Sequence, residues 1–173
     1  MKKEILEWVK TIIISLIIAL VITTFIKPTI VKHYSMQPTL DENDFLIINR
    51  LLYTRGTPER GDIIVFESNQ RDNSGDQKLL IKRIIGLPGE DIEIRGGQVY
   101  INEELLNEPY LADDYTHGNI YQMIPENTLF VMGDNRNNSL DSRNEGLGLV
   151  DFEDIVGKAF FRLYPFSEIG TIE

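Results

Sequence analysis

The sequence predicts a mainly β domain, built as an antiparallel sheet or barrel-like fold, on a single N-terminal transmembrane helix. Two observations carry this prediction. Residues 11–26 form an uncharged apolar run, and the rest of the chain consists of short apolar runs broken by Gly, Pro, Asn and Asp. No long amphipathic helix is predicted after residue 27. A chain of 173 residues is long enough for one domain of ordinary size and one additional element.

The apolar run TIIISLIIALVITTFI is predicted to span a membrane. It lies at the short end of the roughly 17 to 25 residues that a spanning helix needs. Lys2, Lys3 and Lys10 precede it and favour a cytoplasmic N-terminus, although Lys27 weakens this asymmetry. Pro28 is a natural helix stop.

Two alternatives for this run are a cleaved secretory signal and a buried core helix. The exit sequence FIKPTI lacks the small residues of a cleavage site, and the run is apolar on every face. We therefore expect residues 1–10 to be cytoplasmic, residues 11–27 to form the transmembrane helix and residues 28–173 to form an extracytoplasmic domain at the cell membrane.

The strands of this domain are predicted from short runs rich in β-branched and aromatic residues. Gly96-Gly97 between alternating apolar residues indicates a hairpin, because both central positions of a type I′ turn need positive φ. Residues 67–77 have no apolar periodicity and predict an exposed loop, and residues 102–123 are expected to cap or extend the sheet. The predicted strand regions are 45–52, 62–66, 79–86, 91–102, 129–132 and 155–164.

The composition excludes several classes of function. The chain has no cysteine, so disulfides, thiolate metal sites and a cysteine nucleophile are excluded. The two histidines, His33 and His117, are far apart, so a zinc site is not expected, and neither a metal nor a cofactor is predicted. A net charge of −10 argues against a nucleic-acid partner and against attachment to anionic lipid by charge alone.

Ser35 is the first candidate catalytic residue, in the segment VKHYSMQPTL that closely follows the apolar run. Pro38 fixes its own φ and restricts Gln37, so the backbone after the serine is stiff. A nucleophile must be held about 3 Å from a carbonyl carbon, and such stiffness suits that task. Ser and Pro are also common turn residues, and by itself the segment predicts only a turn.

Lys82 is the second candidate, because it lies in the aliphatic strand LLIKRIIG. Charged residues are seldom fully buried, and adjacent strand residues face opposite sides, so Lys82 and Arg83 are not expected to enter the core together. One hypothesis is that both are partly exposed. The other is that Lys82 is desolvated and kept neutral as a general base, which arginine cannot be.

The third candidate is the polar segment MGDNRNNSLDSRNEG, residues 132–146. It partly resembles a calcium loop, but Arg136 and Ser139 stand where such a loop needs a ligand and a glycine, so calcium is rejected. An ordered loop is the simplest interpretation. A further role is to fix other groups through Asp–Arg pairs and hydroxyl hydrogen bonds.

These stretches, in this order behind an N-terminal anchor, resemble the bacterial type I signal peptidases over nearly the whole chain. Each matching motif is modest alone, and the four together are specific. The matching segments are SMQPTL (35–40), GDIIVF (61–66), KRIIGLPGE (82–90) and GDNRNNSLDSR (133–143).

The resemblance implies a Ser-Lys dyad protease that cleaves signal peptides from exported preproteins. Ser35 would attack the scissile carbonyl and form an acyl-enzyme, and neutral Lys82 would be the general base, a known variant of triad chemistry. By the same resemblance, Ser139 would orient the lysine amine, and Asp141 and Arg143 would form a supporting ion pair. The backbone N–H of Ser35 would donate to the oxyanion.

The resemblance also implies how substrate is bound. The signal peptide would lie extended between the strand leading into Ser35 and the strand carrying Lys82. Pockets for small side chains at the first and third positions before the cut would be lined by Val31, Met36, Leu40 and Ile81, although ordinary core packing is an alternative for each of these residues.

His33 departs from the family pattern, because many members have a small or hydroxyl residue two positions before the nucleophile. It is expected either to donate to the oxyanion or to point away, and to change rate or substrate range. The alternatives to a general peptidase are an enzyme dedicated to one substrate such as a pilin, and a silent homologue that binds partners. A self-cleaving repressor module is disfavoured by the hydrophobic span, and a purely structural β module leaves the mid-strand lysine and the polar loop unexplained.

Overall fold

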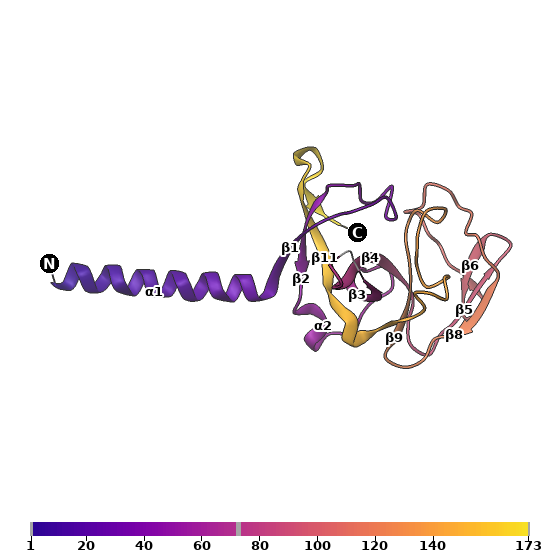
Figure 1. The fold of residues 1–173 in the computed structure, drawn as a ribbon, viewed down its shortest axis with the longest axis horizontal. Helices are drawn as coiled ribbons and strands as arrows, with labels where there is room; N and C mark the ends of the chain where they lie inside the picture. Colours follow the sequence, from indigo (N-terminus) through magenta and orange to yellow (C-terminus); the bar gives the residue numbers. More distant parts are fainter. Residues whose placement is uncertain (1, 72–73, 173) are drawn as a thin grey trace.

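A computed structural model of the chain describes residues 2–71 and 74–172, and it consists of one long helix and a two-sheet β domain (Figure 1). The helices are α1 (Lys2–Phe25) and α2 (Leu52–Arg55). The strands are β1 (Ile26–Ile30), β2 (Phe45–Asn49), β3 (Ile63–Arg71), β4 (Gln77–Gly86), β5 (Asp91–Arg95), β6 (Gln98–Ile101), β7 (Glu104–Leu105), β8 (Ile120–Met123), β9 (Thr128–Met132), β10 (Val150–Asp151), β11 (Ile155–Tyr164) and β12 (Gly170–Thr171). Two 3₁₀ turns, η1 (Phe152–Asp154) and η2 (Phe166–Glu168), flank β11.

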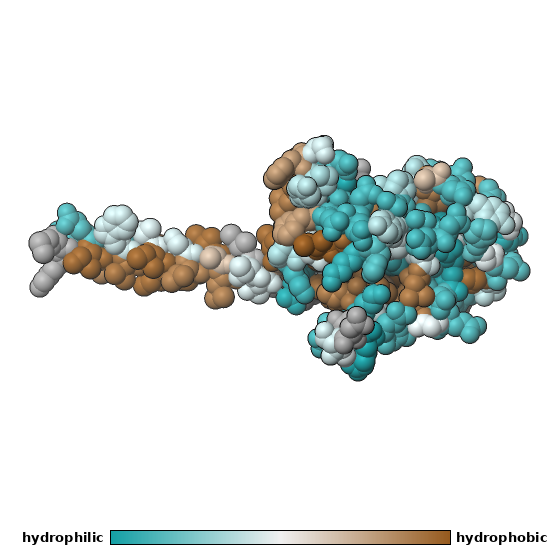
Figure 2. All heavy atoms as spheres, turned by 45° about the horizontal axis from the view of Figure 1, so that its top comes forward, coloured by the Kyte–Doolittle hydropathy of each residue, from teal (hydrophilic) through white to brown (hydrophobic). Residues whose placement is uncertain are grey.

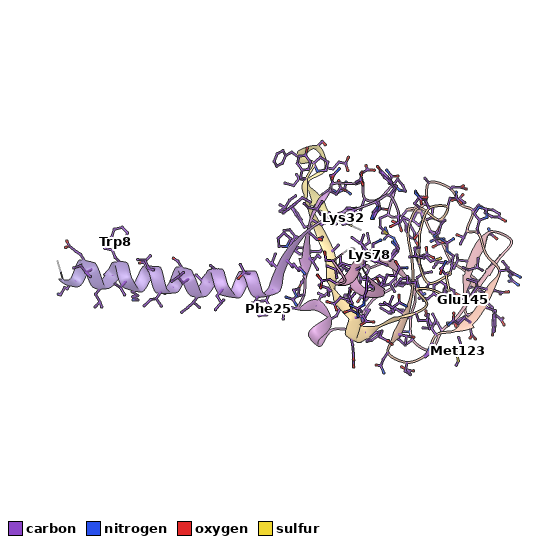
Figure 3. The ribbon with its side chains drawn as sticks, in the orientation of Figure 1. Trp8, Phe25, Lys32, Lys78, Met123 and Glu145 are labelled. Atoms are coloured by element: carbon purple, nitrogen blue, oxygen red, sulfur yellow. The ribbon has the colours of Figure 1, made fainter. Side chains whose placement is uncertain are left out.

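The helix α1 projects from the β domain as a stalk (Figure 1). Its 24 residues make it about 36 Å long, enough to cross a hydrocarbon core of about 30 Å. Within residues 3–25, an 18-residue window has a mean hydropathy of 2.4, and none of that window is buried in the structure. Figure 2 shows the apolar side chains along the stalk, and Figure 3 places Trp8 near its start and Phe25 at its junction with the domain. By length and composition the helix is a candidate membrane span.

The larger sheet has the strand order β1-β2-β11-β3-β4-β9-β10, with β12 paired to β11, and all of its pairs are antiparallel. The smaller sheet has the order β7-β6-β5-β8 and is also antiparallel. In Figure 1 the small sheet lies at the end of the domain remote from α1. The predicted mainly antiparallel β class is confirmed, but its strands form two sheets.

Two predictions of local structure need correction. The helix expected over residues 11–27 ends at Phe25, and Ile26–Ile30 form the edge strand β1, where Pro28 is tolerated because an edge strand can lack one N–H. The expected loop 67–77 is shorter, because β3 continues to Arg71 and β4 begins at Gln77. Residues 102–123 extend a sheet as expected, because they contribute β7 and β8, the outer strands of the small sheet. The Gly96-Gly97 hairpin joins β5 to β6, and both glycines have positive φ.

The hydrophobic core has three parts that meet at β4. One cluster joins the small sheet to the large one through residues such as Ile85, Ile94 and Phe130. A second lies on the other face of β4 and includes Ile84 and Phe66. The third underlies the segment between β1 and β2 and consists of Val31, Met36, Leu40, Leu46, Ile63 and Ala159. Because both faces of β4 are covered along its C-terminal half, residues 82–86 are all buried.

Candidate active site

Ser35 lies in the turn that connects β1 to β2, residues 31–44. We call these residues the nucleophile turn, after the candidate role of Ser35. Backbone hydrogen bonds close this turn at its base, where the Val31 and Asp44 backbones pair at 2.9 Å, and within it, where the Leu40 N–H donates to the Met36 carbonyl at 2.9 Å. Val31, Met36 and Leu40 point into the third core cluster and are almost fully buried. Apolar anchoring below therefore fixes a turn whose serine side chain is half-buried at the surface.

Lys82 comes from the middle of β4, paired with Ile64 of β3, and its ammonium nitrogen reaches the nucleophile turn. Lys82 Nζ lies 2.7 Å from Ser35 Oγ and 2.9 Å from the carbonyl oxygen of Ile81. The fold thus brings together two side chains that are 47 positions apart in the sequence. This is the distance at which an amine can exchange a proton with a hydroxyl.

Burial lowers the pKa of Lys82 to about 8, because removal from water disfavours the charged form. The carboxylates of Asp141 and Asp134 act in the opposite direction, and the positive charge of Lys78 adds to the lowering. At pH 7 a group with a pKa of 8 is about 10% neutral, compared with about 0.03% for an ordinary lysine. Lys82 is therefore a competent base close to neutral pH.

Arg83 is as buried as Lys82, contrary to the expectation that only one of them would enter the core. The two side chains do face opposite sides of β4, but both sides are covered. Arg83 forms a bidentate ion pair with Asp134, with Nε–Oδ1 at 2.9 Å and Nη2–Oδ2 at 2.8 Å, and it also donates to the carbonyl of Gly61. Thr39 of the nucleophile turn donates to the same carboxylate, so Asp134 links that turn to β4.

The polar loop that follows β9 holds the backbone around Ser35. The Asn135 N–H donates to the Ser35 carbonyl at 3.0 Å, and Asn135 Nδ2 donates to the carbonyl of Tyr34 at 3.1 Å. Arg143 and Asp141 form a bidentate pair at 2.8 and 2.9 Å. Asp141 also accepts from the Gly133 N–H at 3.2 Å, so the pair braces the start of the loop.

Ser139 lies beside the nucleophile turn without a hydrogen bond from its buried hydroxyl among the described residues. Lys82 Nζ forms hydrogen bonds with Ser35 and Ile81, and the hydrogen bond expected from Ser139 to the lysine is not formed in this structure. A Cβ built on Gly133 would come within 2.3 Å of both Ser139 Oγ and the Ser35 carbonyl oxygen. The loop can approach the nucleophile this closely because residue 133 has no side chain.

The remaining predicted site residues lie around the dyad. His33 is exposed and has a φ of 73°, a left-handed conformation that a histidine adopts less readily than glycine. Ile81 is half-buried and packs against the cluster that contains Val31, Met36 and Leu40. The four residues expected to line substrate pockets therefore belong to one apolar cluster beneath Ser35, in which the first three are almost closed to solvent.

Several residues of the site were not predicted from the sequence as members of it, among them Arg83, Asp134, Thr39, Arg136 and Glu108. Arg136 pairs with Glu108, a residue of the segment between β7 and β8. One signal in the sequence could have indicated them. Arg83 follows Lys82 in an aliphatic strand, and a second charge buried there needs a partner of its own. The partners could not be found from spacing, because Thr39, Asp134 and Glu108 come from three separate segments.

A serine and a desolvated lysine at hydrogen-bond distance on a mainly β domain are the arrangement expected of a serine peptidase whose general base is a lysine. Comparison with known proteins identifies the family. The family model for signal peptidase, peptidase S26, matches residues 5–164. The chain belongs to this signal peptidase family.

Two relatives match this chain over almost its whole length, and a solved structure matches more than half of it. Signal peptidase I S of Bacillus subtilis (strain 168) is 42% identical, with 97% of this chain and 94% of the relative covered. Signal peptidase IB of Staphylococcus aureus (strain COL) is 36% identical with the same coverage. A crystal structure of a signal peptidase I from Enterococcus faecalis V583 is 35% identical, with a TM-score of 0.50 over 59% of this chain and 96% of that one. Membership makes the chain a serine peptidase of the family that acts on the signal peptides of exported preproteins, as expected from its motifs.

Proposed function

We propose that this protein is a membrane-bound endopeptidase that cleaves signal peptides through a Ser35–Lys82 dyad and an acyl-enzyme. The observation that carries the proposal is the distance of 2.7 Å between Ser35 Oγ and Lys82 Nζ, with the lysine almost fully buried. The family membership supports the class of substrate, and the geometry supports the assignment of the two catalytic groups.

The chemistry proceeds in two steps that share one base. Neutral Lys82 accepts the hydroxyl proton of Ser35 as Oγ attacks the scissile carbonyl, and the resulting ammonium gives a proton to the departing amine. This releases the mature chain and leaves the signal peptide as an ester on Ser35. Lys82 then takes a proton from water, the hydroxide equivalent attacks the ester, and the proton returns to Ser35.

Charge on the carbonyl oxygen is stabilised by hydrogen-bond donors. We assign the backbone N–H of Ser35 as one donor, and His33, two residues earlier, is the candidate for a second. Asp141 and Arg143 support the loop that faces the nucleophile, and Ser139 is assigned to orient the lysine amine when substrate closes the site. Its buried and unpaired hydroxyl beside Gly133 supports that assignment.

Substrate specificity follows from an extended binding mode. The end of the signal peptide lies as an added strand between the segment before Ser35 and the residues before Lys82. Val31, Met36, Leu40 and Ile81 border the first and third side chains before the cut. Because these four residues pack closely together, only small side chains fit there, as in an Ala-x-Ala site.

The protein is placed in the membrane with its catalytic domain outside the cytoplasm. The apolar helix α1 supports anchoring in the lipid bilayer, and Lys2, Lys3 and Lys10 support a cytoplasmic N-terminus. Ser35 follows the end of α1 by ten residues, so the nucleophile stays close to the outer surface of the membrane. Anchoring enzyme and substrate in one bilayer raises the effective concentration of the cleavage site.

The test is cleavage of a preprotein with an Ala-x-Ala signal by full-length protein in detergent. Wild type is expected to cut after the final alanine, and Ser35→Ala and Lys82→Ala are expected to leave the preprotein intact. Cleavage by a folded Ser35→Ala variant would overturn the assignment of the nucleophile. A folded wild type that cuts pilin precursors but no general preprotein would restrict the proposal to a dedicated enzyme, and no cleavage of either would support a silent homologue.

A further inference from the structure

The long segment between β7 and β8 crosses from the small sheet to the polar loop, residues 132–146. We refer to residues 106–117 as the strap. It has no regular secondary structure, but it is fixed by backbone hydrogen bonds, with the Leu106 N–H on the carbonyl of Val99 at 2.9 Å and the Thr116 N–H on that of Gly97 at 2.8 Å. Leu106 and Tyr110 pack against the core beneath the small sheet. The strap is therefore tied at both ends to β6 and its hairpin.

The strap holds Arg136 of the polar loop through a buried ion pair. Arg136 donates to both oxygens of Glu108, with Nη1–Oε2 at 2.9 Å, and it also donates to Thr116 Oγ1. The side chains of Arg136 and Glu108 are 1% and 8% exposed, so neither charge has water as a substitute partner. The third guanidinium nitrogen, Nε, donates to the carbonyl of Gly133 at 3.2 Å. The pair thus connects the strap to the residue that touches the nucleophile turn.

A second contact connects the strap to the strand that carries the base. The Tyr110 hydroxyl donates to Glu108 at 2.7 Å, and its ring stacks on Arg83, with Cζ 3.9 Å from the ring centre. Arg83 is the neighbour of Lys82 and the partner of Asp134. The strap therefore contacts both halves of the dyad's support, β4 through Tyr110 and the polar loop through Glu108.

We infer that Glu108 is a positioning residue for the dyad, acting through Arg136 to hold residues 133–135 against the nucleophile turn. The inference rests on the proposed roles of Ser35 and Lys82. Without Glu108, the buried guanidinium of Arg136 loses its ion-pair partner and is expected to move toward water. That movement withdraws Gly133 and Asn135, whose contacts fix the Ser35 carbonyl. A displacement of the order of 1 Å at reacting groups can lower a rate about 100-fold.

A matched control separates positioning from stability. Glu90 also accepts from an arginine, at 2.5 Å from Arg60 Nη2, and also lies between the two sheets, at the connection from β4 to β5. Its carboxylate contacts Arg60 and the Leu87 N–H, outside the polar loop and the nucleophile turn. Glu90→Gln is therefore expected to lower thermal stability while leaving turnover unchanged.

The experiment measures kcat and KM for an Ala-x-Ala preprotein, across pH, with full-length Glu108→Ala, Glu108→Gln, Glu108→Asp and Glu90→Gln. Glu108→Ala is expected to lower kcat about 10- to 100-fold with KM within about threefold. Its pH profile moves to higher pH, because water that enters around Lys82 returns the pKa of that lysine toward its ordinary value. Glu108→Asp, which keeps the charge, recovers part of kcat, and Glu108→Gln lies between Asp and Ala.

Three results would overturn the inference: wild-type kcat in a folded Glu108→Ala, an unmoved pH profile, or an equal loss in Glu90→Gln. If Glu108→Ala does not fold, Glu108→Gln and Tyr110→Phe carry the same comparison with smaller losses of kcat, and unchanged kcat in both contradicts the inference. Because Ser35→Ala is assayed beside them, failure of the dyad and failure of the strap give different outcomes. An inactive wild type would contradict the proposed dyad. An active wild type together with fully active Glu108 variants would contradict only the inference about the strap.

Discussion

The two sheets of the domain bury different kinds of residue. The strands of the small sheet bury aliphatic side chains, Ile92, Ile94, Val99 and Ile101, and among the described residues of β5–β8 none that is polar. The large sheet and its loops bury charged groups, among them Lys82, Arg83, Asp62, Asp134 and Asp141. A buried charge has to be compensated by a partner at a fixed position, whereas an aliphatic cluster tolerates small shifts. The large sheet therefore fixes geometry, and the small sheet mainly supplies cohesion and the strap.

The largest difference in kcat between a variant beside the large sheet and one in the small sheet is expected for Gly133. In Gly133→Ala the new Cβ would lie 2.3 Å from the Ser35 carbonyl and from Ser139 Oγ, so the nucleophile turn or the loop must move. We expect kcat to fall about 100-fold or more. The matched control is Gly96→Ala in the small sheet, where a Cβ meets open space but the positive φ costs about 1 kcal/mol. Equal kcat in the two variants would contradict the tight contact at Gly133.

Ion pairs give the next contrast. Asp134→Asn removes the carboxylate charge from the buried ion pair with Arg83, and the free energy of unfolding is expected to fall by about 3 to 5 kcal/mol. Glu93→Gln breaks the exposed Arg95–Glu93 contact of the small sheet, 3.5 Å long, and should cost at most about 0.5 kcal/mol. Denaturant titration of both variants in detergent checks the difference. Similar losses would mean that burial does not distinguish the two pairs.

A smaller effect on function is expected from the core of the small sheet. Ile94 is fully buried against Phe130 and its neighbours, so Ile94→Ala should lower the free energy of unfolding by about 2 to 5 kcal/mol. Because Ile94 belongs to a core cluster that contains neither Ser35 nor Lys82, kcat measured well below the melting temperature should stay within about twofold of wild type. A large loss of kcat in this folded variant would show that the small sheet determines more of the site geometry than the strap contacts account for.

Local patterns in the sequence predicted much of this architecture, and long-range partners were beyond their reach. Strand runs, the apolar helix and the Gly96-Gly97 hairpin are encoded by residues close together in the chain. The second sheet and the edge strand β1 depend on which strands pair. Pro28 predicted the end of the helix but not the edge strand that contains it. Residue identity and family resemblance indicated Ser35 and Lys82, but not that Arg83 would be buried as well.

The supporting groups were missed for a related reason. The polar loop was expected to fix other residues, and Asp141 and Arg143, two positions apart, were proposed as a pair from the resemblance. Asp134 instead reaches Arg83, and Arg136 reaches Glu108, which precedes it by 28 positions in a segment with no periodic pattern. Arg136 and Glu108 pair because the strap and the polar loop cross in the folded domain, and no local sequence pattern predicts that crossing.

The measurement that tests the account most directly is the pH dependence of kcat/KM for wild-type protein on an Ala-x-Ala preprotein. Lys82 must be neutral to accept the proton of Ser35, and burial lowers its pKa to about 8. The rate should therefore rise about tenfold per pH unit below pH 7 and level off above about pH 8 to 9. A profile that is flat between pH 6 and 9, or one that continues to rise with a midpoint near the ordinary pKa of lysine, would contradict a desolvated Lys82 as the general base.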